Sequence, residues 1–253
     1  AATALSYDIK RITGVQPLVS TAAITDNTAI IVGTIGQSPL IDTLIANRKL
    51  NTSAINGKWE AYTAAVINTP LPGVEQALVI AGSDRRGTAY GVFALSEAIG
   101  VSPWYFWGDV ATAKKPALYV SGSYTQHSPA VKYRGIFIND EDWGFQPWAA
   151  KTFEPEFGNI GPKTYATVFE LMLRLHANTI WPAMHEYPRE STPFYLHPQN
   201  KVVADNYAVI ISTSHHEPMM RNSHEYKPEK LGDYSYWSNR DNIYTFWEQR
   251  VIE

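Results

Sequence analysis

The chain has 253 residues, long enough for one or two domains, and a formal net charge of −3 at neutral pH. With 45% hydrophobic and 18% charged residues, its composition predicts a packed core and argues against intrinsic disorder. The negative charge argues against a nucleic-acid partner, and the absence of cysteine excludes disulfides and zinc sites built on cysteine.

The first half of the chain predicts an α/β domain. A short helix should follow a Ser38 cap and end at Ala46, and a longer one should begin after Asp84 and end at Gly100. The longer helix is apolar on two sides, as expected for a helix packed in a layered domain. Residues 1–128 are therefore predicted to form an N-terminal, sandwich-like α/β domain. Its strands are expected at residues 29–33, 59–68, 76–81 and 117–122, with a linker at 126–130.

The second half of the chain predicts strands and helices that alternate. Continuous apolar strands in such a pattern indicate a parallel sheet, and the long loops after the first and third strands are typical of functional sites. Residues 129–253 are therefore predicted to form the first three β/α units of a TIM (β/α)8 barrel, which needs about 250 residues to close. The strands are expected at residues 133–138, 178–181 and 207–213, and the helices at 161–175, 191–205 and 240–253.

Three carboxylates follow the first strand of this predicted barrel, in the run Asn139-Asp140-Glu141-Asp142. Hydrolysis of a sugar linkage uses paired carboxylates, one that donates a proton and one that activates water or attacks. Carboxylates at a strand end also bind sugar hydroxyls through charge-assisted hydrogen bonds. We predict that Asp140 is catalytic and that Asn139 and Glu141 bind substrate. The alternative is a solvated acidic turn.

Trp181 and His185 close the second predicted strand. In the functional interpretation, the tryptophan ring stacks on a sugar beside a polar side chain. In the structural interpretation, the tryptophan caps the interior of the barrel. The sequence leaves both interpretations open, and both residues are predicted to bind substrate.

His215, His216 and Glu217 follow the third predicted strand, and Arg221 lies close behind. Neighbouring residues on an extended segment point to opposite faces, so at most one of the two histidines enters a site directly. The spacing differs from the His-Glu-x-x-His pattern of zinc sites, so no metal and no cofactor are predicted. We predict that His215, His216, Glu217 and Arg221 bind substrate. One histidine would donate to the substrate, and the arginine would pair with a substrate carboxylate. Satisfied structural histidines and a surface arginine are the alternative.

The two long loops are rich in aromatic residues. The second loop carries Tyr226, Tyr234, Tyr236 and Trp237. Flat aromatic rings suit the apolar faces of pyranose sugars, whereas long loops also need small cores of their own. The sequence does not decide between these two uses for any single residue.

Four segments of the chain resemble the N-terminal part of glycoside hydrolase family 115, whose members are xylan α-glucuronidases. The resemblance implies a catalytic barrel that removes glucuronic acid, or its 4-O-methyl ether, α-1,2-linked to xylose in glucuronoxylan, with inversion. It also implies a homodimer and a secreted or periplasmic enzyme. No membrane partner is expected, because no apolar run reaches the roughly 20 residues of a membrane span. The segments are Gly-Ser-Asp-Arg-Arg-Gly-Thr-Ala-Tyr-Gly at 82–91, Tyr-Arg-Gly-Ile-Phe-Ile-Asn-Asp-Glu-Asp at 133–142, Ala-Asn-Thr-Ile-Trp-Pro-Ala-Met-His at 177–185, and Ser-His-His-Glu-Pro-Met at 214–219.

The resemblance also implies roles for single residues. By position, Asp140, Trp181 and His215 match site residues on the first three barrel strands of the family. The general acid of the family is a glutamate on a later strand, expected beyond Glu253. Inversion needs two carboxyl groups about 6.5–9.5 Å apart. The chain alone is therefore expected to be inactive and to need the remainder of the enzyme, as a second chain or a missing segment.

Two other interpretations stay open. The first is another barrel glycosidase with a similar front domain, such as a family 20 β-N-acetylhexosaminidase or a family 67 α-glucuronidase. The runs at 181–185 and 214–218 favour family 115 over both. The second is a noncatalytic glycan-binding module, which would keep the aromatic loops but need no buried carboxylate with a shifted pKa.

Overall fold

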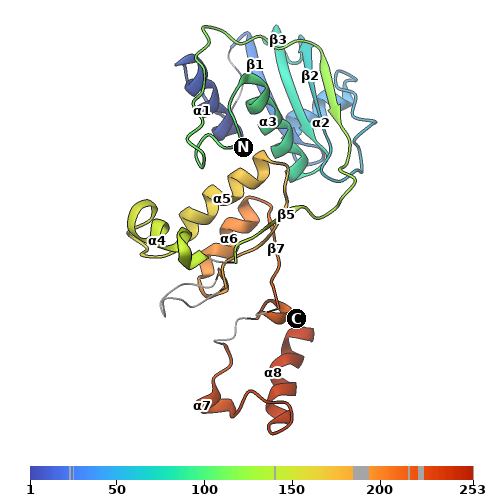
Figure 1. Cartoon of the computed structure of the whole chain (residues 1–253). Coiled ribbons are helices and arrows are strands. Elements are labelled where there is room, and N and C mark those ends of the chain that lie inside the picture. The colour runs from blue at the N-terminus through green and yellow to red at the C-terminus, as the bar shows by residue number, and fades with distance from the viewer. Residues whose placement is uncertain are drawn as a thin grey trace. The chain divides into compact units, whose positions relative to one another are not determined.

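The computed structural model describes residues 1–22, 24, 26–139, 141–184, 194–215, 217–221 and 225–252. The chain separates into two compact units, shown with their elements in Figure 1. Unit 1 contains Ala1–Lys132 and Leu171–Ala177, and unit 2 contains Tyr133–Glu170 and Asn178–Glu253. No helix among the described residues is both long and apolar enough to cross a membrane.

Unit 1 is built on a mixed four-stranded sheet with the order β1-β3-β2-β4. Strand β3 is parallel to β1, in a register that pairs Thr28 with Gln76 and Thr34 with Gly82. Strand β2 is antiparallel to both β3 and β4. The strands are β1 (Thr28–Thr34), β2 (Tyr62–Asn68), β3 (Gln76–Gly82) and β4 (Ser123–Gln126).

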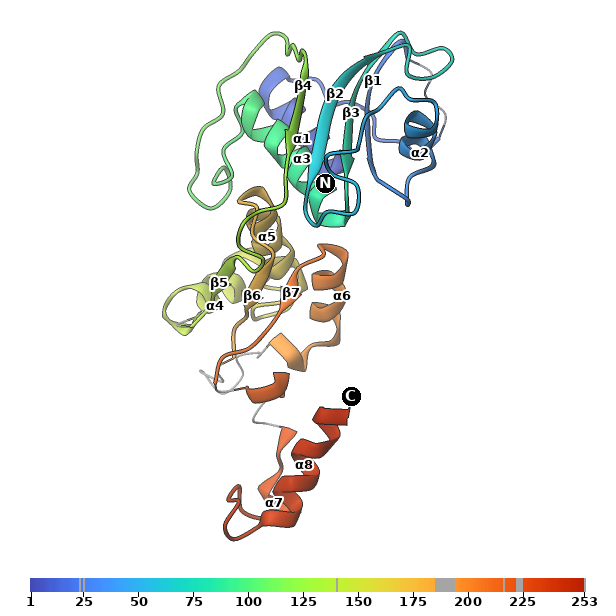
Figure 2. The same cartoon turned by 90° about the vertical axis from the view of Figure 1, so that its right-hand side faces the viewer.

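Helices cover both faces of this sheet, as Figure 2 shows. On one side, α2 (Pro39–Ala46) contributes Ile41 and Leu44 to a core cluster with residues of β1 and β3. On the other side, α1 (Ala2–Thr13) and α3 (Arg85–Ile99) pack around a second cluster. That second cluster contains Leu5, Ile12, Ile80, Val92, Ile99 and Val101.

The local signals that predicted α2 and α3 are confirmed. The Ser38 side chain accepts a hydrogen bond from the Ile41 amide, and the Asp84 carboxylate accepts one of 2.7 Å from the Gly87 amide. Gly100 ends α3 with φ 113°, a left-handed conformation that glycine adopts without strain.

Four details of unit 1 differ from the sequence prediction. No strand forms at 117–122, because Leu118 and Val120 line a cleft instead of pairing with a neighbour. The sheet is completed by β4, so Gln126 pairs with Tyr62 and is not part of a linker. Strand β2 begins at Tyr62 and not at residue 59. Helix α1 was not predicted at all.

Unit 2 contains a parallel three-stranded sheet with the order β5-β6-β7, which confirms the predicted parallel pairing. The strands are β5 (Gly135–Phe137), β6 (Thr179–Trp181) and β7 (Ile210–Ile211). The helical elements are η1 (Glu141–Trp143), α4 (Phe145–Trp148), the π-helix η2 (Ala149–Phe153), α5 (Pro162–Arg174), η3 (Phe194–Leu196), α6 (Pro198–Asn206), η4 (Pro218–Met220), α7 (Pro228–Leu231) and α8 (Arg240–Ile252).

The strands of unit 2 are shorter than predicted. Strand β5 was expected to be buried, but Ile136 is 47% exposed, because among the described residues β5 pairs only with β6. Strand β7 was expected to begin at Tyr207, but that residue caps the end of α6. Ala208 follows with a left-handed φ of 54°, which prevents an extended strand from beginning there.

Candidate functional site

The carboxyl ends of the three parallel strands meet at one edge of the sheet in unit 2. The Ile138 amide donates to the Trp181 carbonyl at 2.9 Å, and the Ser212 amide donates to the Ile180 carbonyl at 3.0 Å. These bonds continue the pairing beyond the strands, so the segments after β5, β6 and β7 leave the sheet side by side. Active sites of parallel α/β sheets lie at this edge.

Trp181 lies at the end of β6 with its ring partly exposed. It packs edge to face against Phe137 at the end of β5, with 5.2 Å between the ring centroids and 70° between the planes. Phe137 therefore fixes one side of the indole, while the exposed part is available for contact. This geometry is compatible with a stacking surface, and the binding role of Trp181 stays a prediction.

Buried polar contacts hold the segment that follows β6 in place. The Ala183 amide donates to the Tyr165 hydroxyl at 3.2 Å, and the Phe194 amide donates to the Ala183 carbonyl at 2.9 Å. The Ser214 hydroxyl lies 2.7 Å from the Met184 sulfur. These contacts hold the segment after β6 against α5, η3 and the segment after β7.

Glu217 is a buried carboxylate in the segment after β7, with 2% of its surface exposed. The Thr213 hydroxyl donates to its backbone carbonyl at 2.6 Å, which closes a tight turn after the strand. Tyr195 lies nearby and donates to the Ser212 carbonyl at 3.1 Å. Burial raises the pKa of Tyr195, and the negative charge of Glu217 raises it further. The tyrosine is thus held protonated beside a buried acid.

Tyr195 was not recognised from the sequence. Its partners come from the β7 segment and lie 17 or more residues further along the chain, so no local spacing signals the contact. The only available signal was its position in an aromatic run, Phe194-Tyr195, shortly after the second predicted strand.

Arg221 is bound to protein groups in the structure. Its Nε donates to Glu225 Oε2 at 3.0 Å, and its guanidinium lies 3.5 Å from the centroid of the Phe246 ring. It also donates to the Phe246 carbonyl. A substrate carboxylate would therefore have to compete with Glu225 for this arginine, and its predicted pairing with substrate stays a prediction.

The other predicted site residues follow β5, β6 and β7 in the sequence. Asn139 is exposed two residues after the end of β5, and His215 is exposed in the turn after β7. Glu141 begins η1. Asp140, His185 and His216 lie outside the described residues. Within the part of the chain that is described, no group of three or more His, Asp or Glu side chains is arranged to bind a metal ion.

One carboxylate of the first long loop has a structural role. Glu154 is buried, and its Oε1 accepts from the Lys163 amide at 3.0 Å. Its Oε2 accepts from the Thr164 amide at 2.8 Å and from the Thr164 hydroxyl at 2.7 Å. These are donors at the amino end of α5, so Glu154 caps that helix.

The aromatic residues of the two loops fall into two groups. Phe145, Trp148 and Phe153 stack in sequence, with centroid distances of 6.1 and 4.9 Å, and form a small core of the first loop. Tyr226 is likewise buried against Phe246 in the second loop. By contrast, Trp143 is exposed. Some loop aromatics therefore form small cores, as one interpretation of the sequence expected. Trp143 presents an exposed ring, as the other interpretation expected.

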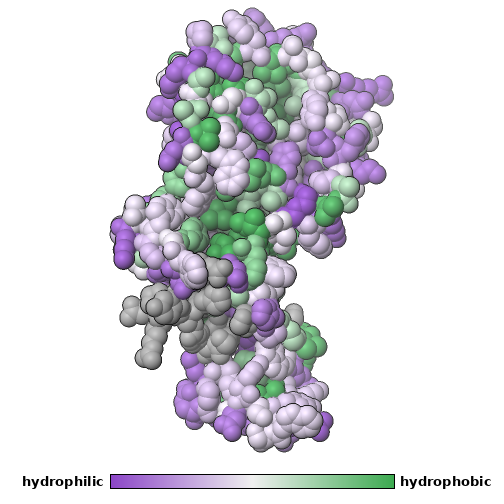
Figure 3. Space-filling model, in the orientation of Figure 1, coloured by the Kyte–Doolittle hydropathy of each residue, from purple (hydrophilic) through white to green (hydrophobic). Residues whose placement is uncertain are grey.

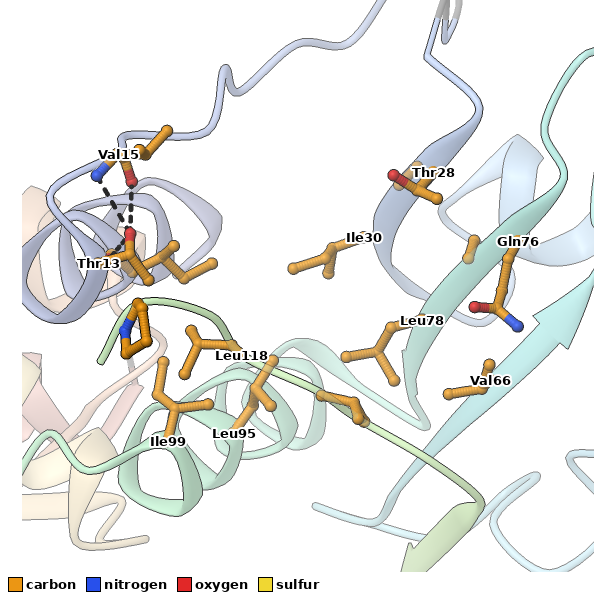
Figure 4. Close-up of a pocket in the computed structure, with 15 residues that line it drawn as sticks. Thr13, Val15, Thr28, Ile30, Val66, Gln76, Leu78, Leu95, Ile99 and Leu118 are labelled. Carbon is orange, nitrogen blue, oxygen red and sulfur yellow. Dashed lines mark hydrogen bonds between the residues drawn. The ribbon is translucent and has the colours of Figure 1, made fainter.

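A separate cleft of about 420 Å³ lies within unit 1, between the sheet and helices α1 and α3. Figure 4 shows Ile30 and Leu78 from the sheet facing Leu95, Ile99 and Leu118 across it. Its polar lining is limited to Thr13, Thr28 and Gln76, and the Thr13 hydroxyl is bound to Val15. Because the lining has no titratable side chain, this cleft offers no acid–base chemistry.

Comparisons with known proteins match both parts of the chain. The sequence model described as Glycosyl hydrolase family 115 matches residues 126–253. A solved structure, entitled a novel family GH115 4-O-methyl-α-glucuronidase, BtGH115A, with specificity for decorated arabinogalactans, superposes with a TM-score of 0.79 at 42% sequence identity. The match covers 98% of this chain but 31% of that protein.

Two further comparisons add nothing to this assignment. The structure of CpGH84D gives a TM-score of 0.46 at 11% identity, covering 98% of this chain and 36% of that one, and is too distant to carry an argument. No curated protein sequence matches the chain.

Proposed function

Because the chain belongs to glycosyl hydrolase family 115, we propose that it forms the front part of an α-glucuronidase. The observation that carries this proposal is the shared edge of β5, β6 and β7, where the segments that follow the three strands leave the sheet side by side. The 42% identity to a 4-O-methyl-α-glucuronidase supports the same reaction.

The proposed reaction is the inverting removal of glucuronic acid, or its 4-O-methyl ether, from a plant polysaccharide. Asp140 is one of the two carboxylates and acts at the anomeric centre with water, while Trp181 stacks on the uronic acid ring. His215 or His216 donates to the sugar, and Glu217, held beside the protonated Tyr195, orients the β7 segment.

Two polysaccharides are candidates for the substrate. Glucuronoxylan, decorated by α-1,2-linked (4-O-methyl)-glucuronic acid, is our first choice. Decorated arabinogalactan is the second, because the solved relative has specificity for it. The same proposal includes a catalytic (β/α)8 barrel, a secreted or periplasmic location and a homodimer.

We also propose that residues 1–253 are inactive alone. Inversion requires a second carboxyl group about 6.5–9.5 Å from the first, with water between them. The chain spans about a third of BtGH115A, so a later strand of a longer or two-chain enzyme is the proposed source of the general acid.

The test is an activity assay on the 253-residue chain and on the longest polypeptide that contains it. Each is incubated with glucuronoxylan and with decorated arabinogalactan, and released uronic acid is followed by ¹H NMR. We expect release by the longer protein only, with the β-anomer appearing first. Release of the α-anomer would refute inversion. Binding of either polysaccharide without any release would favour the noncatalytic glycan-binding module.

A further inference from the structure

The loop between α7 and α8 presents three exposed aromatic rings. Tyr234 and Tyr236 are about half exposed, and Trp237 is 96% exposed. An indole ring left in water forgoes roughly 1.5–3 kcal/mol of burial free energy, so its display on an ordered loop calls for an explanation.

The conformation of this loop is fixed from within. The Asn239 side-chain amide donates to the Asp233 carbonyl at 2.9 Å and to the Leu231 carbonyl at 2.5 Å. The same amide lies 3.0 Å from the Tyr226 hydroxyl, which itself lies 3.0–3.1 Å from the carbonyl oxygens of residues 231–233. Gly232 completes the turn with a left-handed φ of 77°.

This internal bracing has a consequence for Trp237. The carbonyls of residues 231–233 are bound by Asn239 and Tyr226, so none of these contacts involves the Trp237 ring. Tyr226 is anchored below by Phe246 and Ile243 in a small core. The rings of Tyr234, Tyr236 and Trp237 are thus displayed on a preorganised base, which lowers the entropy lost when a ligand binds.

The side chains around the rings fit a sugar ligand better than an apolar protein surface. Residues 232–242 contain no aliphatic side chain, and hydroxyl, amide and charged groups alternate with the rings. The Arg240 guanidinium lies 5.5 Å from the Tyr236 ring centroid. Figure 3 shows the surface over α7 and α8 mainly in pale and purple shades, with little green. A pyranose ring, with C–H faces and hydroxyl edges, matches this pattern of aromatic faces and polar neighbours.

We propose that Tyr234, Tyr236 and Trp237 form a binding surface for the backbone of the polysaccharide that carries the uronic acid. This inference rests on the proposed function, and it adds a site that holds the polymer outside the catalytic centre. The loop follows β7, so the surface lies on the chain segment that leaves the sheet at the edge of the candidate site. Trp237 provides most of the contact because its ring is almost completely exposed.

The test compares polymeric and short substrates with the active enzyme that contains these residues. Trp237→Ala should raise KM for the polysaccharide by roughly threefold to tenfold, the size expected of one aromatic stacking contact, and leave kcat unchanged. KM for a short aldouronic oligosaccharide should not change. Trp237→Phe should restore part of the loss. Tyr119→Ala is the matched control, because Tyr119 is 93% exposed in unit 1 and should affect neither substrate.

Two results would overturn the inference. Equal changes in KM for polymer and oligosaccharide would place Trp237 in the catalytic centre. A fall of several degrees in Tm for Trp237→Ala would show that the ring is covered by protein in the complete enzyme. If the wild-type enzyme releases no uronic acid, the proposed function fails. Affinity electrophoresis in polysaccharide gels then still tests the surface, through retardation of wild type but not of Trp237→Ala.

Discussion

The two sheets of the chain differ in how completely they are covered. In unit 1, the three long strands pair over seven residues, and helices bury side chains on both faces of the sheet. In unit 2, the strands have two or three residues, and β5 leaves Ile136 and Phe137 exposed. Unit 1 places its polar residues where they cap and brace helices. In unit 2, Trp181 ends a parallel strand and the buried Glu217 lies on a segment that follows one, so the less covered sheet is the one on which we propose the site.

The largest expected effect belongs to unit 2. Asp140→Asn in the active enzyme should lower kcat by about 10²–10⁴-fold, because the amide can neither activate water nor carry the charge that develops in the transition state. Initial rates of uronic acid release measure this change. Asp142→Asn, two residues further along, is the control and should stay within a few fold of wild type. A similar loss in both variants would indicate a general effect on the loop.

The largest expected effect in unit 1 is on stability. Arg174 at the end of α5 and Asp8 of α1 form an ion pair of 2.8 Å that is almost completely buried. Asp8→Asn leaves an uncompensated buried guanidinium, so we expect a loss of about 3–5 kcal/mol in the free energy of unfolding. Urea denaturation followed by circular dichroism measures it. The double variant Asp8→Asn/Arg174→Met should recover part of the loss, and a single-variant loss below about 1 kcal/mol would show that the pair is solvated.

This ion pair also explains why α1 was missed in the sequence. Asp8 interrupts the apolar face formed by Leu5 and Ile12. Its partner Arg174 lies at the end of the first predicted barrel helix, more than 160 residues further along the chain. Helix α3, in contrast, was predicted with its ends, because Asp84 and Gly100 are local signals that act through backbone hydrogen bonds and φ. Helix ends that depend on neighbouring residues could be predicted from the sequence. A buried ion pair between residues far apart in the chain could not.

The same distinction holds in unit 2. The order and parallel pairing of the three strands could be predicted, because each strand is an apolar run separated from the next by a helical pattern. The lengths of the strands could not be predicted. They depend on how many residues of β5 and β7 pair with β6, and on the left-handed conformation of Ala208. Tyr195 and Glu154 were missed for a related reason: their partners come from other elements, so their roles depend on the fold.

A smaller effect is expected from the cap of α5. Glu154→Gln replaces one acceptor oxygen by a donor that faces the donors of Lys163 and Thr164, so we expect a loss of about 1–2 kcal/mol in unfolding free energy. Thermal unfolding measures it. The control is Glu156→Gln in the same loop, whose exposed carboxylate lies 3.5 Å from Lys163 Nζ and should contribute no measurable stability. Equal losses in both variants would rule out a capping role.

The smallest effect is confined to alkaline pH and concerns Tyr62 of β2. Burial raises the pKa of Tyr62 to about 12, with added contributions from the charges of Tyr124 and Glu97. In the unfolded chain the phenol ionises near pH 10, so between pH 10 and 12 the unfolded state releases a proton that the folded state retains. Stability from this group is therefore complete below pH 10 and is lost as the pH rises through that window.

Tyr62→Phe removes this ionisation and should make unit 1 less sensitive to alkali. The urea midpoint of the variant should fall less than that of wild type between pH 10 and 12, with no difference in slope between pH 7 and 9. Tyr119→Phe, at an exposed position, is the control and should follow wild type. An unchanged slope for Tyr62→Phe would mean that the phenol is hydrated in solution. In that case β2 would be exposed to solvent, as β5 is. The two sheets would then not differ in how well this strand is covered.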